Sequence, residues 1–253
     1  MDPRDKVALV TGGGVRVGRA ISLGLARSGA HVLVHYNQSS SSAEETVAEA
    51  RHLGVEALAV QCDLSKPELV GAVIEAAEAA FGGVDILVHS ASPFVKGSLY
   101  DVTLDTWRKL MGVLVESFLL LVQGLAPTMV RRGQGSIVAM LDRGVFEPWP
   151  AYLAHGVGKS ALWALVRSLA VELSPEVRVN AVVPGPVLPP PGFTQAQMDW
   201  VSKTTLLGRW GIPQDVVEAV LFLLRSEFVT GEAIFVDGGE RWARRPTESA
   251  RDR

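Results

Sequence analysis

The chain has 253 residues, of which 48% are hydrophobic and 20% charged, and its formal net charge is −3. This balance predicts a globular protein with a substantial core, and a chain without a basic excess gives no indication of nucleic-acid binding. The single cysteine, Cys62, excludes an internal disulfide and suits a reducing compartment, so we expect a cytoplasmic protein.

The first residues run straight into a strand-like segment, which does not resemble a signal peptide. Apolar runs such as Phe118–Val122 are far shorter than the roughly 18 residues that span a membrane. We therefore expect no membrane attachment.

Short β-branched runs alternate along the chain with Ala-rich amphipathic segments. We predict strands at Lys6–Thr11, His31–His35, Glu56–Gln61, Val84–His89, Gly135–Met140, Arg178–Val182 and Ala233–Val236. We predict helices at Arg16–Ser28, Ser42–Leu53, Pro67–Phe81, Leu104–Arg132, Pro150–Leu173 and Pro213–Arg225. This alternation predicts an α/β fold, a single-domain, doubly wound parallel sheet of Rossmann type with helices on both faces.

The predicted domain covers residues 1–239, because no repeat or linker interrupts it. The Pro-rich stretch Val182–Phe193 is expected to be an irregular loop that is too short to separate domains. Residues 240–253 form a highly charged tail that we expect to be partly disordered. No set of residues indicates a metal site.

The first predicted strand ends in a cluster of glycines, Gly12, Gly13, Gly14 and Gly18. Glycine permits a sharp turn and the close approach of a ligand, and the following helix start presents free N–H groups to a phosphate. A glycine cluster alone can be only a tight turn. Because this one follows the first strand of an α/β chain, it predicts a dinucleotide site.

Four motifs in order resemble the short-chain dehydrogenase/reductase family. Thr11, Gly12 and Gly18 match its glycine motif, with Arg16 in place of the middle glycine, as in the pteridine reductase branch. The other matches are the Asp-Leu pair at residues 63–64, the Pro-Gly turn in 182–187 and the strand 230–239. The resemblance implies cofactor contacts at Gly12, Arg16, Val17, Gly18, Tyr36, Asp63, Leu64, Ser90, Ala91, Lys159, Pro184 and Gly185.

The segment His35–Ser40 is expected to face the adenosine ribose and contains no acid. A carboxylate here would favour NAD and repel a 2′-phosphate, so its absence favours NADP(H). Arg16 supplies a cation, and Asn37, Gln38 and Ser39 can donate hydrogen bonds. The pteridine reductases have an arginine where Gln38 stands, and the alternative is that these residues form only a solvated loop.

The resemblance places three residues at the catalytic positions. Lys159 matches the family lysine, His155 occupies the position of the proton-donating tyrosine and Asp142 that of the serine, while Leu114 replaces the asparagine of a water relay. Imidazole paired with a carboxylate is a competent general acid, but it is shorter than a phenol by about 2 Å. His155 is thus either the proton donor or a non-catalytic wall of the pocket.

Aromatic residues are expected to line the substrate pocket, which the segment Pro184–Trp210 covers in this family. The candidates are Phe94, Trp149, Tyr152 and Trp200. The alternative for Phe94 is ordinary packing, and for Tyr152 it is a place in the core or the pocket wall. Tyr152 is predicted on the helix face of His155 and Lys159, roughly one turn or about 5 Å from the former.

Two hypotheses follow from these residues. The first is an NADPH-dependent reductase of a pteridine-like molecule or another carbonyl or imine, including a 3-oxoacyl thioester or another ketone. The second is a cofactor-binding protein with little or no turnover that serves a binding or regulatory role. The resemblance also implies a homotetramer, assembled through the two long helices predicted at Leu104–Arg132 and Pro150–Leu173.

Overall fold

A seven-stranded parallel sheet forms the centre of the computed structural model, which describes residues 1–243. The strands are β1 (Val7–Thr11), β2 (His31–Tyr36), β3 (Ala57–Gln61), β4 (Ile86–His89), β5 (Gly135–Met140), β6 (Val177–Pro184) and β7 (Ala233–Val236). They are ordered β3-β2-β1-β4-β5-β6-β7. The order reverses between β1 and β4, and in doubly wound sheets ligands bind at the carboxyl ends of the strands at such a point.

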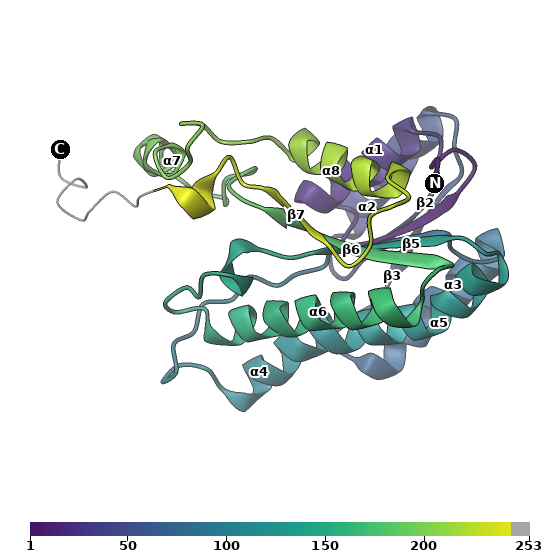
Figure 1. The fold of residues 1–253 in the computed structure, drawn as a ribbon, viewed down its shortest axis with the longest axis horizontal. Coiled ribbons are helices and arrows are strands. Elements are labelled where there is room, and N and C mark those ends of the chain that lie inside the picture. The colour runs from purple at the N-terminus through teal and green to yellow at the C-terminus, as the bar shows by residue number, and fades with distance from the viewer. Residues whose placement is uncertain (244–253) are drawn as a thin grey trace.

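Helices cover both faces of the sheet (Figure 1). They are α1 (Arg16–Arg27), α2 (Ser40–His52), α3 (Val70–Phe81), α4 (Leu104–Met111), α5 (Ser117–Arg131), α6 (Leu153–Glu172), α7 (Gln195–Ser202) and α8 (Pro213–Arg225). Figure 1 shows α1, α2 and α8 on one face and α3 to α6 on the other. The predicted single α/β domain with a doubly wound sheet is confirmed.

The strands are apolar on both faces because each face packs against a helical layer. Leu9, Leu33 and Leu87 join one core cluster, whereas their neighbours Ala8 and Val10 join the other. Side chains alternate between the faces of a strand, so a run without polar residues fits a strand that is covered on both sides. The two clusters hold the carboxyl ends of β1, β4 and β5 rigidly at one edge.

The predicted long helix over 104–132 is three segments in the structure. A π-helical turn, Gly112–Glu116, separates α4 from α5. A second difference is the start of α6 at Leu153 rather than Pro150, because Ala151 has a left-handed φ of 62° and Tyr152 caps the helix. The predicted start of this helix at Pro150 is therefore wrong, and Tyr152 precedes its first turn.

The segment Leu104–Arg131 is long and apolar enough to cross a membrane by length and composition alone, and half of its most apolar window is buried in the protein. Our prediction considered only uninterrupted apolar runs, so it did not include this segment among the candidates for a membrane span. Phe118, Leu121 and Leu125 from it lie in the core. Core helices of soluble proteins pass the same test, so this is weak evidence for a membrane span.

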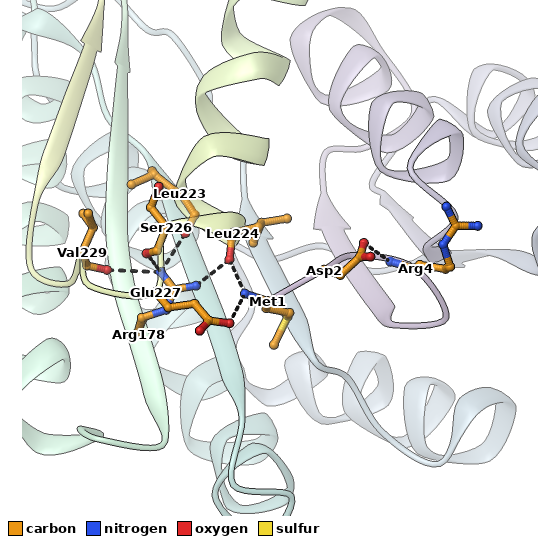
Figure 2. Close-up of polar contacts among 9 residues, drawn as sticks. All are labelled: Met1, Asp2, Arg4, Arg178, Leu223, Leu224, Ser226, Glu227 and Val229. Atoms are coloured by element: carbon orange, nitrogen blue, oxygen red, sulfur yellow. Dashed lines mark hydrogen bonds and ion pairs between the residues drawn. The ribbon is translucent and has the colours of Figure 1, made fainter.

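Arg178 on β6 ties the carboxyl end of α8 to the sheet (Figure 2). Its guanidinium donates hydrogen bonds to the carbonyls of Leu223, Leu224, Ser226 and Val229 at 2.7–3.1 Å. Helix ends leave carbonyls without intrahelical partners, and an arginine satisfies several of them at once. The N-terminal ammonium also donates to the Leu224 carbonyl, at 2.8 Å.

The first residues of the predicted tail are ordered against the domain. Glu240–Trp242 form a 3₁₀ helix, and the Glu240 carboxylate lies 3.5 Å from the guanidinium of the buried Arg143. Residues 244–253, the greater part of the predicted tail, lie outside the described residues.

Candidate active site

Asp142, His155 and Lys159 meet at the carboxyl end of β5. Asp142 follows that strand by two residues, and the other two lie one turn apart near the start of α6. The His155 Nε2 lies 2.5 Å from the Asp142 Oδ2, and the Lys159 Nζ donates to the Met140 carbonyl at 2.5 Å. The three predicted catalytic residues therefore form one cluster.

Burial and charge set the ionisation of this cluster. Burial alone would raise the pKa of Asp142, but the hydrogen bond from His155 and the charge of Lys159 hold that pKa below its ordinary value. Burial lowers the pKa of Lys159 to about 8, and the Asp142 charge opposes this effect. Near neutral pH the site thus contains a carboxylate beside an ammonium group.

Both ring nitrogens of His155 contact hydrogen-bond acceptors. Nε2 faces the Asp142 carboxylate, and Nδ1 lies 3.1 Å from the Pro93 carbonyl oxygen. A carboxylate and a carbonyl can only accept, so both nitrogens donate and the ring is an imidazolium paired with Asp142. The His155 side chain is 2% exposed and that of Asp142 15%, so Asp142 is the more accessible member of the pair.

An aromatic cluster packs over His155. The Phe94 ring stacks on Tyr152 at 4.6 Å and meets the His155 ring edge-on at 5.0 Å, while Trp149 lies edge-on to both phenyl rings at 6.0–6.2 Å. The backbone of Gly97, which pairs with Ala151 and Leu153, holds the Phe94 segment here. Three of the four predicted substrate residues are thus brought together, and the fourth, Trp200, lies partly buried on α7.

A crevice of about 340 Å³ lies along the carboxyl ends of β1, β2 and β4. The predicted residues that line it are Gly12, Tyr36, Asn37, Gln38, Ser39, Asp63, Leu64 and Ala91. Lys109 and Val113 on the other side line it as well, and the sequence did not identify them. The Asp63 carboxylate accepts from the Ser65 N–H and hydroxyl at 3.0 and 2.7 Å, which fixes its direction.

The glycine turn leaves no room for side chains where a dinucleotide would approach. A Cβ on Gly18 would lie 2.1 Å from the Gly12 carbonyl oxygen, and one on Gly12 would lie 3.1 Å from the Ala91 Cα. Gly12 also has a φ of 64°, which strains any other residue. The turn therefore fits the bare backbone that binds a pyrophosphate, and neighbouring Val17 packs partly buried against the core.

Arg16 links the glycine turn to the segment expected to cover the substrate. Its backbone φ is 51°, where a non-glycine residue is strained, and its guanidinium donates to the carbonyls of Leu188 and Pro189 at 3.2 and 3.3 Å. Nearby, Gly185 donates its N–H to the Val236 carbonyl, and a Cβ on it would lie 2.6 Å from the Asp237 Cα. The Pro184–Gly185 turn is thereby fixed against β7.

The π-helical turn presents a carbonyl that ordinary helix geometry would have used internally. The Val113 carbonyl oxygen accepts from the Ser117 hydroxyl at 2.7 Å and lies 3.2 Å from the His89 Nε2. Leu114 is fully buried, and the Cδ1 of its side chain would lie 2.8 Å from a Cβ on Gly158. Leu114 therefore fills the helix interface with apolar packing.

Sequence reasoning did not identify four residues that shape the site. Thr11, His35 and His89 hydrogen-bond to the glycine turn or to its neighbours, and the Pro93 carbonyl orients His155. Thr11 lies in the glycine motif and His35 in the segment expected to face the ribose, so their positions were a signal. The partners of the two histidines, by contrast, depend on strand pairing between distant segments.

Comparison with known proteins agrees with this geometry. A family model described as enoyl-(acyl carrier protein) reductase matches residues 14–240. Human dehydrogenase/reductase SDR family member 4 is 34% identical over 248 residues, covering 93% of this chain and 87% of that protein. Among solved structures, FolM alternative dihydrofolate reductase 1 from Brucella canis, complexed with NADP, has a TM-score of 0.91 at 27% identity, covering 98% of both chains. L-sorbose reductase from Gluconobacter frateurii, complexed with NADPH and L-sorbose, has a TM-score of 0.89 at 30% identity, covering 95% of this chain and 98% of that one. The chain therefore belongs to the short-chain dehydrogenase/reductase family of oxidoreductases.

Proposed function

We propose that this protein is an NADP(H)-dependent reductase of a carbonyl or imine group on a flat, pteridine-like molecule. The observation that carries the proposal is the Asp142–His155 pair beside Lys159, below the ring cluster of Phe94, Trp149 and Tyr152. Flat heterocycles stack on such rings. The similarity to a dihydrofolate reductase that binds NADP supports the same class of substrate.

Eight of the residues predicted to bind the cofactor line the crevice, and Lys159 lies beside Asp142. The crevice from Gly12 to Ser39 would hold the adenosine and its phosphates, and no carboxylate lies within residues 35–40 to repel a 2′-phosphate. Lys159 would hold the nicotinamide ribose. When bound, the cofactor supplies the hydride, so the chain itself must supply a proton.

The hydrogen-bond pattern supports Asp142 as the group that delivers that proton. The His155 N–H groups point at Asp142 and Pro93, and Asp142 rests as a carboxylate, so the proton starts on His155. The proton would pass from Nε2 to the more accessible Asp142 carboxylate and from there to the substrate oxygen or nitrogen, which leaves His155 neutral until it takes a proton from water. Lys159, whose charge lowers the pKa of Asp142, favours return of the carboxylate after transfer.

A substrate panel tests this proposal. The purified protein is mixed with NADPH and, separately, with a dihydropterin, dihydrofolate, simple ketones and a 3-oxoacyl thioester, and oxidation of the cofactor is followed by absorbance. Turnover of a pterin that Asp142→Asn abolishes is the expected result. If only the thioester or a ketone is turned over, the proposed pteridine-like substrate is wrong, whereas the proposed cofactor, NADP(H), stands.

A second function is favoured by one specific observation. With both His155 nitrogens bound to protein acceptors and Leu114 in the place of the relay asparagine, the same fold can bind NADP(H) without turning it over. Binding measured by calorimetry, together with no turnover over the panel, would establish that binding role.

We also expect a homotetramer formed through α4–α5 and α6, which light scattering measures.

A further inference from the structure

Two buried histidines flank the end of β1, where the glycine turn begins. His35 lies on β2 and His89 ends β4, the two strands that pair with β1 on either side. Their exposed fractions are 2% and 1%. Neither residue is part of the proposed proton transfer, so their burial at this point needs another explanation.

The partners of His35 define its protonation. The Gly12 N–H donates to Nδ1 at 3.1 Å, which requires that nitrogen to carry no hydrogen. Nε2 lies 3.0 Å from the Cys62 carbonyl oxygen and therefore donates. The Gly13 N–H also donates to the His35 carbonyl at 2.9 Å, so one residue binds two successive amides of the turn.

The hydrogen-bond partners of His89 place its ring in the same protonation state as that of His35. The Thr11 hydroxyl oxygen accepts from the N–H groups of Ser90 and Ala91 at 2.9 and 3.0 Å. Its own hydrogen is then donated to the His89 Nδ1 at 3.2 Å, and the His89 Nε2 donates to the Val113 carbonyl at 3.2 Å. His89, like His35, is a neutral ring protonated on Nε2.

We infer that His35 and His89 are positioning residues that clamp the Thr11–Gly12 turn from both sides and set the shape of the dinucleotide crevice. One set of hydrogen bonds joins the Cys62 carbonyl to Gly12 through His35, and the other joins Thr11 to the Val113 carbonyl through His89. The Thr11–Gly12 backbone connects the two sets, and Gly12 and Val113 line the crevice. This inference rests on the proposed binding of NADP(H).

Electrostatics agree with the geometry. Burial lowers the pKa of His35 to about 4, against the opposing effect of the Cys62 carbonyl. Burial and then the Lys159 charge lower the pKa of His89 to about 3. An apolar replacement would leave the Gly12 N–H or the Thr11 hydroxyl without an acceptor, and leaving a buried donor unpartnered is destabilising.

The test measures NADP⁺ affinity by calorimetry in matched variants. His35→Phe and His89→Phe are expected to weaken binding about tenfold or more, the equivalent of one lost hydrogen bond. His35→Asn and His89→Asn keep an acceptor near Nδ1 and are expected to restore most of the affinity. The control is His31→Phe at the opposite end of β2, where Nδ1 accepts from the Glu56 N–H at 3.0 Å, and its affinity should be unchanged.

Nitrogen-15 NMR of the imidazoles in the unsubstituted protein provides a readout independent of binding and of variant folding. Both rings should show the neutral Nε2–H form at near-neutral pH. An Nδ1–H or doubly protonated ring at either position would overturn the inference. Phenylalanine variants with a lower Tm but an unchanged affinity for NADP⁺ would overturn it as well. If the unsubstituted protein does not bind NADP⁺, the proposed function itself is wrong, and the positioning role of His35 and His89 is wrong with it.

Discussion

His155→Phe removes the hydrogen bond to Asp142 while retaining a planar ring. The substitution leaves the carboxylate and the Pro93 carbonyl without the donors that lie 2.5 and 3.1 Å away. A hydrogen bond to a charged group contributes about 1.5–3 kcal/mol and a neutral one about 1 kcal/mol, so we expect a loss of about 3 kcal/mol in the free energy of unfolding. For a domain of this size, that loss lowers Tm by roughly 6–12 °C.

Thermal and urea denaturation measure this loss, and two variants make it specific. His155→Gln retains an amide N–H near Nε2 and should lose only about 1 kcal/mol. His52→Phe, on the exposed face of α2, should leave stability nearly unchanged. If the Tm of His155→Phe equals that of the unsubstituted protein, the hydrogen-bonded pair of Asp142 and His155 does not form in solution. With a substrate in hand, the same variant should reduce turnover by roughly 10²–10⁴-fold, the range of general acid catalysis.

Three further predictions concern ionisation and the anchoring of α8. The free energy of unfolding should fall as pH drops from 6.5 toward 4. The reason is that the unfolded chain protonates His35 and His89 at their ordinary pKa of 6.5, whereas their pKa values in the folded protein are about 4 and about 3. Stability measured over this pH range should fall less steeply in His35→Asn. If the Lys159 ammonium holds the cofactor, NADP⁺ affinity should decline as pH rises through about 8, and Lys159→Met should bind weakly with no such decline, as calorimetry over pH would show. Arg178→Met should lower the free energy of unfolding by about 2–4 kcal/mol in urea denaturation, because several carbonyls at the end of α8 lose their donor, whereas Arg178→Lys should recover part of the loss.

The sheet could be predicted closely because its signal is local. β5 and β7 begin and end where predicted, since each is a short apolar run between turn residues. The helix α7 was not predicted because the Pro-rich stretch before it reads as loop. Its capping box, in which Thr194 and Gln197 bond reciprocally, was the signal that could have revealed it.

The site could be predicted only where it follows from local spacing. His155 and Lys159 stand four residues apart on α6, so their proximity follows from helix geometry. The direction of the imidazole depends instead on the Pro93 carbonyl, 62 residues earlier in the chain. The left-handed Ala151, which moves Tyr152 off the helix, likewise reflects pairing with Gly97 rather than any preference of alanine.

Two positions that we expect to depart from the family motif, 114 and 155, lie at one interface, because Leu114 clusters with Ala154, the neighbour of His155. The family resemblance implies an asparagine at position 114 that completes a water relay. Here the Val113 carbonyl is bound by His89 and Ser117, and Leu114 closes the interface with α6 by apolar contact. Because this interface is filled by apolar contact, we expect the proton source to be the pair of His155 with Asp142 rather than a water relay. We therefore expect His155→Tyr alone to supply a donor without supplying a path that reloads it.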